Sequence, residues 1–269
     1  MKSKILVFIP TYRCESQIVR VFGQFNDQVQ KWVDTVMVVD NQSPDRTMEI
    51  AIDFGRDQLK GCNFVAWSND ENYGLGGSHK VAFRYAIEQG FDYLVVLHGD
   101  DQADIRDLVS LFEIGAHSKV DCLLGARFMP KSCLDGYSRF RRLGNRVYNQ
   151  LFSLVTLKKV YDLGSGLNVY KLSAYRDFFY KTFPDDLTFN YVMLLAAFHR
   201  RQSVRFFPIT WREYDQISNV KIFYQAFKVL GYLGSYLIGR ASFLKSERRL
   251  RSFDSYTGKI RYCRSSIEK

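Results

Sequence analysis

The sequence predicts an α/β fold with a mostly parallel sheet and helices on both of its faces. Short apolar runs without polar alternation recur in the first hundred residues, which is typical of strands buried on both faces. A segment with the apolar spacing of a helix follows each of the first three runs. This alternation of strand and helix predicts parallel strands joined by crossover helices. The apolar fraction of 46% is enough for a sizeable core.

The elements of the predicted fold can be placed in order along the chain. We expect strands at residues 5–9, 35–39, 63–67 and 93–97. We expect the intervening helices from residue 15 to 25, 47 to 54 and 78 to 89. After residue 121 the pattern is looser, with strands expected at 123–128, 168–171 and 204–208. Further helices are expected around 139–146, over 186–200 and over the long apolar segment 222–244.

The net charge of +10 is concentrated at the C-terminal end. Residues 240–269 contain nine Lys and Arg but only three acidic residues. An apolar helix followed by a basic tail suits a position in the interface of an anionic membrane. The alternative is a core or dimer helix with a solvated tail, and a homo-oligomer remains open. No segment reaches the roughly 18 apolar residues of a membrane span, so we expect peripheral attachment. No motif supports nucleic-acid binding.

The five cysteines indicate a reduced, cytoplasmic chain. They are odd in number, scattered and without a CxxC pair, which argues against a disulfide scaffold or a zinc site. The apolar run at residues 5–9 is too short for a signal peptide and meets Pro10. We therefore expect a cytoplasmic protein on the inner face of the membrane.

Three polar loops follow predicted strands and should meet at the carboxyl edge of the sheet. They comprise residues 10–15, 40–45 and 98–102. Asp40 and Asn41 carry acceptors suited to the donors of a base or ribose. Oxygen ligands in the third loop suit Mg²⁺ or Mn²⁺, although this loop also has the composition of a solvated turn before a helix. Glycines at 74, 76 and 77 allow either a close ligand approach or a plain turn.

Six motifs occur in an order that resembles family 2 glycosyltransferases. The resemblance covers residues 4–235 and is closest to the polyprenyl-phosphate branch, which includes dolichol-phosphate mannose synthase. It implies a GT-A fold, a nucleotide-diphosphate sugar donor, Mg²⁺ or Mn²⁺, and inversion at the anomeric carbon. The motifs are Ile9-Pro10-Thr11-Tyr12 with Glu15, Val38-Val39-Asp40-Asn41-Gln42-Ser43-Pro44-Asp45-Arg46-Thr47, Asn72-Tyr73-Gly74, His98-Gly99-Asp100-Asp101-Gln102, Gly125-Ala126-Arg127-Phe128 and Asp162 with Ser165-Gly166.

The resemblance also implies which residues bind the donor and the metal. The metal ligands would be His98, Asp100 and Gln102, with His98 in place of the first acid of the DxD element. A neutral imidazole can ligate Mn²⁺ or bind a diphosphate oxygen, and the alternative is a weakened site carried by Asp100, Gln102 and Asp101. Asn41 and Gln42 replace the usual Asp-Gly, which leaves the nucleobase open. The nucleotide-sugar contacts would be Pro10, Thr11, Tyr12, Glu15, Asp40, Asn41, Asn72, Gly74 and Asp100.

The kind of acceptor determines whether the transfer reaction needs a general base. A phosphate acceptor is already ionised and needs cations rather than a general base. The residues implied for it are Arg127, Arg141, Arg142, Ser165 and Lys221. A sugar hydroxyl would need a base, for which Asp186 is the candidate, although Asp185 and Asp186 also suit a helix N-cap. The arginines would otherwise form a solvated helix face. The catalytic candidates are therefore Asp100, Arg127 and Asp186.

We expect an inverting glycosyltransferase that moves a sugar to a polyprenyl phosphate at the cytoplasmic membrane face. The first alternative is transfer to a sugar hydroxyl of a lipid-linked glycan in surface polysaccharide assembly, such as O-antigen or capsule. More remote alternatives are a sugar-phosphate nucleotidyltransferase and an inactive binding homologue. Residues 1–220 would form the catalytic domain, with a nucleotide-sugar half (1–120) and an acceptor half (121–220). Residues 221–269 would form the interfacial helix and basic tail.

Overall fold

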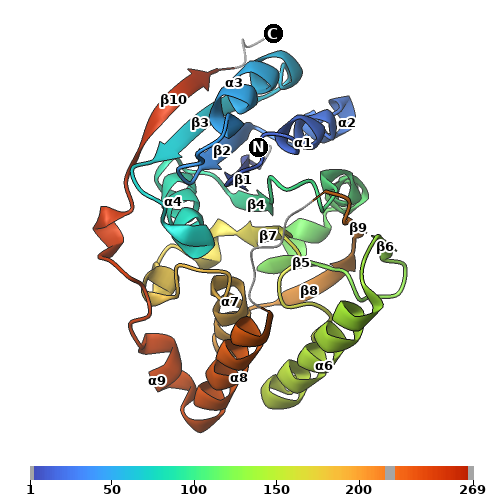
Figure 1. The fold of residues 1–269 in the computed structure, drawn as a ribbon, viewed down its shortest axis with the longest axis vertical. Helices are drawn as coiled ribbons and strands as arrows, with labels where there is room; N and C mark the ends of the chain where they lie inside the picture. The colour runs from blue at the N-terminus through green and yellow to red at the C-terminus, as the bar shows by residue number, and fades with distance from the viewer. Residues whose placement is uncertain (1–2, 216–221, 266–269) are drawn as a thin grey trace.

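A computed structural model describes residues 3–215 and 222–265. Its centre is an eight-stranded sheet in the order β10-β3-β2-β1-β4-β7-β5-β8 (Figure 1). The strands of this sheet are β1 (Ile5–Thr11), β2 (Thr35–Asp40), β3 (Asn63–Asn69), β4 (Tyr93–Leu97), β5 (Cys122–Ala126), β7 (Leu167–Lys171), β8 (Val204–Pro208) and β10 (Gly258–Arg264). The described helices are α1 (Ile18–Gly23), α2 (Asp27–Gln30), α3 (Thr47–Gln58), α4 (Gly74–Glu88), α5 (Val109–Glu113), α6 (Arg139–Thr156), α7 (Phe189–His199), α8 (Ile222–Ile238) and α9 (Arg240–Lys245).

The N-terminal half is the parallel sheet that the sequence predicts. Strand β1 pairs in parallel with β2 and β4, and β2 pairs in parallel with β3. Every residue of β1 is buried: Ile5 and Val7 pack in a core with α1, whereas Leu6 and Phe8 pack in a second core with α4 and α7. Both faces of the strand are thus covered, which explains its unbroken apolar run. The predicted fold class is confirmed.

The C-terminal half of the sheet is mixed in direction. Strand β7 pairs antiparallel with both β4 and β5, while β8 pairs in parallel with β5. A separate two-stranded sheet joins β6 (Cys133–Asp135) to β9 (Thr210–Arg212). The sequence analysis did not predict β6 or β9, because three residues are too few to show a periodicity.

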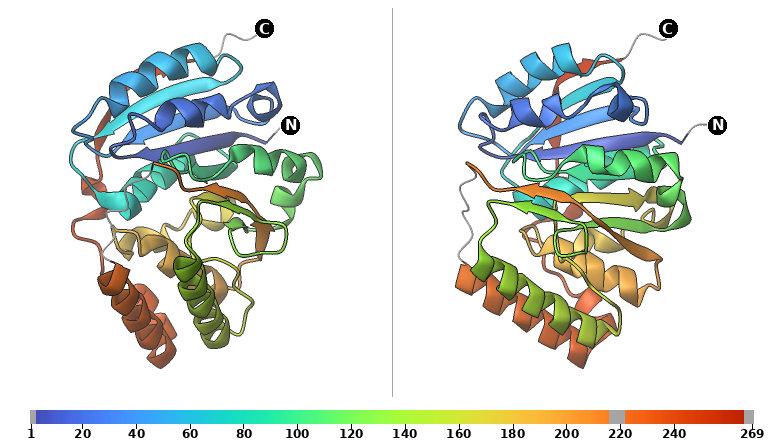
Figure 2. Two further views of the ribbon diagram at one scale, coloured as in Figure 1. Left: turned by 45° about the vertical axis from the view of Figure 1, so that its right-hand side comes forward. Right: turned by 90° about the vertical axis from the view of Figure 1, so that its right-hand side faces the viewer.

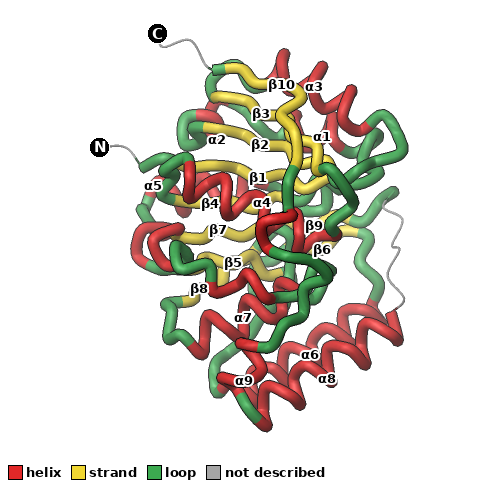
Figure 3. Tube along the Cα trace, turned by 90° about the vertical axis from the view of Figure 1, so that its left-hand side faces the viewer, coloured by secondary structure: helices red, strands yellow, loops and turns green. Residues whose placement is uncertain are grey.

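The C-terminal segment differs from the prediction in two ways. The single helix expected over 222–244 is two helices, because Gly239 between α8 and α9 has the non-helical angles φ −154° and ψ 82°. Strand β10 was not predicted, since Lys259 and Arg261 interrupt its apolar pattern. Charged residues are common in such a strand, which lies antiparallel to β3 at the edge of the sheet (Figure 3).

The chain between α9 and β10 passes over a buried ion pair. Lys80 in α4 is fully buried, and its Nζ lies 2.7 Å from Oδ1 of Asp185. The hydroxyl of Tyr256 donates to the same carboxylate oxygen at 2.6 Å, and the backbone N–H of Leu250 donates to Oδ2 at 2.7 Å. The C-terminal segment therefore completes the hydrogen bonding of a buried charged pair that joins α4 to the loop before α7.

Helices α6 and α8 lie side by side at the end of the molecule beyond β8 (Figure 2). Within the ranges 3–215 and 222–265, no helix is both long and apolar enough to cross a membrane.

Candidate active site

The loops that follow β1, β2 and β4 meet at the carboxyl edge of the sheet. The backbone N–H of Asn41 donates to the carbonyl of Thr11 at 3.0 Å, and that of Gly99 donates to the carbonyl of Pro10 at 3.1 Å. The pKa of the buried Cys14 thiol is raised to about 12, mainly by burial, and the carboxylates of Asp100, Asp45 and Asp40 from all three loops contribute to the rise. The three polar loops thus form one site, as the sequence predicts.

Asp40 offers an acceptor in this site. Its side chain is buried, and burial raises its pKa. Oδ2 accepts the backbone N–H of Ser43 at 3.1 Å, but Oδ1 is buried without a partner among the described residues. A buried acceptor without a donor is costly, so Oδ1 is suited to a ligand donor.

Asn41 and Asn72 have structural partners. Oδ1 of Asn41 accepts Nδ2 of Asn69 at 2.9 Å and the backbone N–H of Tyr73 at 2.8 Å. Nδ2 of Asn41 donates to Oδ1 of Asn72 at 2.7 Å, and the same oxygen accepts the backbone N–H of Gly74 at 3.0 Å. The side-chain nitrogen and oxygen of Asn41 are therefore both used to join the loops after β2 and β3.

The start of α4 requires glycine. Gly74 has a φ of +67°, and a Cβ there would collide with the carbonyl oxygen of Asp185.

The remaining donor-side candidates lie on the first loop. Tyr12 is 40% exposed, with the guanidinium of Arg13 5.4 Å from its ring centroid. Glu15 is exposed and accepts the backbone N–H of Arg46 at 3.0 Å.

His98 turns into the protein towards α4. Its backbone N–H donates to the carbonyl of Gly166 at 3.0 Å, and its ring centroid lies 6.3 Å from that of His79. Burial, together with the positive charge of Arg127, lowers its pKa to about 4, so the imidazole is neutral at physiological pH. Its Nε2 is buried and makes no hydrogen bond within the described part of the chain. A neutral nitrogen of this kind is a possible metal or diphosphate ligand.

The carboxylate of Asp100 lies in a setting that disfavours its charge. Burial raises its pKa to about 6, although the backbone N–H of Gln102, 3.2 Å from Oδ1, opposes the shift. A bound cation would stabilise the ionised form. Asp101 is already engaged, because its carboxylate accepts Nε of Arg20 at 2.7 Å and Nε2 of Gln24 at 2.9 Å. The carboxylate of Asp101 therefore anchors α1 and the residue after it to this loop.

The donor set fits Mg²⁺ or Mn²⁺ when the substrate completes it. The described residues contain no group of three or more His, Cys, Asp or Glu side chains able to hold a metal by themselves. Mg²⁺ sites often use one or two carboxylates and take the other ligands from water and substrate phosphates. Asp100 supplies one such carboxylate, and Gln102 and the imidazole of His98, whose Nε2 has no partner in the described structure, belong to the same loop.

Replacing Asp100 with asparagine should stabilise the metal-free protein at high pH. The folded-state pKa is raised, so the neutral acid favours folding at low pH and this contribution is lost as the pH rises through about 6. At about pH 8, Asp100→Asn should therefore increase the free energy of unfolding by about 3 kcal/mol. Urea denaturation in EDTA would measure it.

The gain from Asp100→Asn should disappear below about pH 3, where the wild-type carboxyl is largely neutral in both states. The exposed residue Asp57 provides the control, since Asp57→Asn should change stability little at either pH. An equal gain at both pH values would show that ionisation of Asp100 is not the cause.

Arg127 forms a buried, bidentate ion pair with Asp162. Its Nε donates to Oδ2 at 2.7 Å and its Nη2 to Oδ1 at 2.8 Å, with side-chain exposures of 10% and 1%. The guanidinium carbon lies 4.7 Å from the ring centroid of Trp211. Its positive charge contributes to the lowered pKa of His98. The same charge partly offsets the burial that raises the pKa of Asp100. Arg127 is therefore a fixed charge at the side of the candidate metal site.

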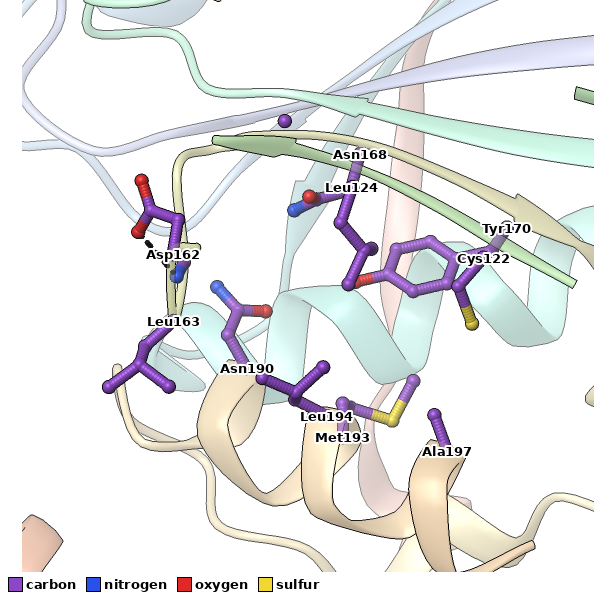
Figure 4. A pocket seen from close by; sticks show the side chains of 12 residues that line it. Cys122, Leu124, Asp162, Leu163, Asn168, Tyr170, Asn190, Met193, Leu194 and Ala197 are labelled. Atoms are coloured by element: carbon purple, nitrogen blue, oxygen red, sulfur yellow. Dashed lines mark hydrogen bonds between the residues drawn. The ribbon is translucent and has the colours of Figure 1, made fainter. Parts of the chain in front are cut away.

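A small cavity lies beside Asp162 (Figure 4). Its volume is ≈ 20 Å³, and Asn168 and Asn190 are among the residues that line it. Oδ1 of Asn190 is buried without a partner in the described structure. A cavity of this size holds about one water molecule, which would satisfy that oxygen. It is too small for a sugar.

A larger, open hollow of ≈ 200 Å³ lies on the other side of Arg127. Arg127, Arg142 and Arg146 line it together with Ser132. Nε of Arg142 is buried and has no hydrogen-bond partner among the described residues. The sequence analysis assigned no role to Arg146 by itself, although its position four residues after Arg142 places both on one side of a helix.

Two other acceptor candidates, Arg141 and Ser165, do not line the hollow. Arg141 is not part of the hollow, because its Nη1 donates to Oε2 of Glu213 at 2.8 Å. Ser165 is completely buried, and its hydroxyl lies 3.4 Å from the carbonyl oxygen of Leu167. Lys221 lies outside the described residues.

Asp186 has the contacts of a residue at a helix entrance. Its Oδ1 accepts the backbone N–H of Thr188 at 2.8 Å, just before α7, and its Oδ2 pairs with Lys228 of α8. Burial opposes its ionisation, but the hydrogen bonds from Lys228 and Thr188 outweigh burial and lower its pKa. A low pKa makes a weak general base.

Comparison with known proteins assigns the family. The model of the family described as Glycosyl transferase family 2 matches residues 6–179. The chain belongs to this family. It is therefore a glycosyltransferase, and the matched region contains the β1, β2 and β4 loops and the Arg127–Asp162 pair. The family assignment sets aside the nucleotidyltransferase and the non-catalytic binding protein.

Several relatives of this family 2 glycosyltransferase are known. An undecaprenyl-phosphate mannosyltransferase of Micrococcus luteus is 26% identical over 176 residues, which cover 64% of this chain and 68% of that protein. Glycosyltransferase AglJ of Haloferax volcanii is 25% identical over 175 residues, covering 64% of this chain and 52% of that protein.

Solved structures confirm a GT-A fold for the family 2 domain. Glucosyl-3-phosphoglycerate synthase from Mycobacterium tuberculosis, in complex with UDP, has a TM-score of 0.61 at 17% identity, over 87% of this chain and 80% of that one. S. aureus TarS (1–349) has a TM-score of 0.57 at 16% identity, over 88% and 66%. The mycobacterial enzyme was also crystallised with Mn²⁺, UDP-glucose and glycerol 3-phosphate.

Proposed function

We propose that this family 2 glycosyltransferase transfers a sugar, with inversion, from a nucleotide-diphosphate sugar to a polyprenyl phosphate at the cytoplasmic membrane face. The observation that carries the proposal is the arginine hollow. Arg142 and Arg146 line it, with a buried Nε of Arg142 that has no partner in the described structure. Guanidinium groups suit a phosphate acceptor, which needs cations but no general base. The relative named undecaprenyl-phosphate mannosyltransferase supports the same acceptor class.

The donor would lie over the loops after β1, β2 and β4. Oδ1 of Asp40, buried without a described partner, would accept a hydrogen bond from the base or ribose. The exposed ring of Tyr12 offers a face for the base. Pro10, Thr11 and Glu15 shape this side, whereas Asn41 and Asn72 would act by holding the loops together.

Asp100 would hold Mg²⁺ or Mn²⁺, with Gln102 and the neutral imidazole of His98. When bound, the metal neutralises charge on the nucleoside diphosphate that leaves. Arg127, fixed by Asp162, contributes a positive charge beside Asp100. Arg142 and Arg146 would hold the acceptor phosphate in the arginine hollow, and its oxygen would replace the diphosphate on the anomeric carbon.

The alternative acceptor, a sugar hydroxyl, would require Asp186 to remove a proton. Its lowered pKa and its pairing with Lys228 argue against that role. We retain the domain division as part of the proposal: residues 1–120 bind the donor, residues 121–220 bind the acceptor, and the segment 221–269 contributes membrane contact. Within that last segment, β10 also completes the sheet.

The test is transfer from a panel of labelled nucleotide sugars to a polyprenyl phosphate with Mn²⁺ or Mg²⁺, with and without EDTA. We expect one donor to give an acid-labile lipid-linked sugar that EDTA abolishes. Transfer only to a glycan hydroxyl, with none to polyprenyl phosphate, would contradict the proposal.

Replacing Arg142 and Arg146 with alanine should weaken acceptor use specifically. Loss of two charged contacts to one phosphate should raise the KM for polyprenyl phosphate at least about 30-fold, since each charge-assisted hydrogen bond contributes roughly 1.5–3 kcal/mol. The KM for the donor should change little, because these residues lie on the acceptor side. Initial rates at varied acceptor concentration would measure the effect.

Arg139→Ala provides the matched control, since Arg139 is exposed on the same helix but does not line the hollow. It should leave both KM values near the wild type. A rise in the donor KM alone for the Arg142 and Arg146 variant would assign the hollow to the nucleotide instead.

A further inference from the structure

Helix α6 carries a stripe of exposed apolar side chains. Large apolar side chains recur on it at intervals of three and four residues, which places them on one face. All five are exposed, whereas Phe152 on the opposite side of the helix is fully buried in the core. The residues of this stripe are Phe140, Leu143, Val147, Leu151 and Leu154.

Helix α8 carries a second exposed stripe, and it lies beside α6 in all views (Figures 1–3). Its buried side chains, Val229, Leu233 and Tyr236, pack against the core. We name the two stripes together the α6–α8 surface. Its α8 members are Phe227, Leu230, Leu237 and Ile238. Exposed apolar side chains gathered on two neighbouring helices indicate a partner.

The charged residues within helices α6, α8 and α9 have one sign, although Asp186 and Glu213 of other segments pair with Lys228 and Arg141. Helices α6, α8 and α9 contain seven Lys and Arg and no Asp or Glu. An apolar face edged by cations matches the interface of a bilayer that contains anionic lipids. A second copy of this chain is a poorer partner, because it would bring two basic surfaces together without acidic residues to offset them.

We propose that the α6–α8 surface docks on an anionic lipid bilayer. The α6 stripe belongs to the acceptor half, outside the C-terminal segment for which the sequence predicts membrane contact. Arg142 and Arg146 are on the same helix, so docking holds the arginine hollow at the lipid head groups. The inference rests on the proposed function in one respect, namely that a lipid phosphate is the ligand delivered there.

The test is vesicle binding by α6 variants of the full chain. Leu143→Gln with Leu154→Gln should reduce partitioning onto vesicles of phosphatidylglycerol and phosphatidylcholine roughly a hundredfold, since each exposed leucine contributes on the order of tenfold when it is buried in the interface. Ile114→Gln is the matched control, because Ile114 and Leu143 are both 63% exposed and Ile114 follows α5, away from α6. The control should bind like the wild type.

Two further measurements separate docking from the other possibilities. Wild-type binding should weaken on pure phosphatidylcholine and at high salt, because part of the attraction is electrostatic. Equal vesicle binding by the variant and the wild type would overturn the proposal. So would a dimer in lipid-free solution that the same substitutions dissociate, since it would assign the surface to a second copy.

Failure of docking and failure of the proposed function give different results. With a short-chain, water-soluble polyprenyl phosphate, the double leucine variant should transfer sugar at the wild-type rate, because its substitutions lie outside the site. If the enzyme binds vesicles through α6 but uses no polyprenyl phosphate, the acceptor assignment is wrong and the docking surface stands. If the short acceptor is used but neither protein binds vesicles, the docking surface is wrong and the acceptor stands.

Discussion

Replacing Asp100 with alanine is expected to reduce sugar transfer at least about a thousandfold while the protein stays folded. Asp100 lies in the loop after β4, and burial raises its pKa to about 6, so burial disfavours its ionised form. In the proposed function, a metal ion held there would stabilise the ionised carboxylate. Its removal takes away the candidate ligand without opening a cavity in either core.

Steady-state transfer rates with varied Mn²⁺ would measure the loss, and circular dichroism would establish that the variant is folded. The neighbouring acid gives a matched comparison. Asp101→Ala should lower stability, since it breaks the contacts to Arg20 and Gln24, yet it should retain most of the transfer rate. Full activity of Asp100→Ala would remove the metal assignment.

Replacing Arg127 with alanine is expected to destabilise the fold by about 3–5 kcal/mol. The carboxylate of Asp162 is only 1% exposed and would be left without its charged partner, with only the backbone N–H of residue 127 and that of Gly164 as donors. Arg56→Ala should cost less than about 1 kcal/mol, because the ion pairs of Arg56 are exposed. Urea denaturation of both variants measures the difference.

A double variant isolates the pair energy of Arg127 and Asp162. Arg127→Ala with Asp162→Ala should recover part of the stability that Arg127→Ala loses, because no unpaired charge remains buried. Should Arg127→Ala cost no more than Arg56→Ala, the pair contributes little to folding, and its burial would need another explanation.

The parallel half of the fold was predictable because each strand carries its signal locally. Buried residues of β1, β2 and β4 are apolar on both faces, and the polar loops that follow them end the runs. The mixed half gave weaker signals. Strand β7 follows a glycine-rich loop and reverses direction, and β10 alternates basic and apolar residues like any solvated segment.

The types and order of the residues indicated where the site would be. They did not indicate which side chains remain available to bind a ligand. From the sequence, Asn41 was expected to contact the base. In the structure, its side chain is hydrogen-bonded to Asn69, Asn72 and Tyr73. Arg141 is hydrogen-bonded to Glu213, which is distant in the sequence, whereas Arg146 lines the arginine hollow. Such partners are set by tertiary packing, and no local pattern in one sequence records them.

The position of β10 has a consequence for how the molecule is made. It pairs with β3, a strand of the N-terminal half, although most of the chain separates the two. During synthesis the edge of β3 therefore stays unpaired until residues 258–264 have left the ribosome, and contacts this distant in sequence form slowly. The part of the protein that is synthesised first is thus among the last to be completed.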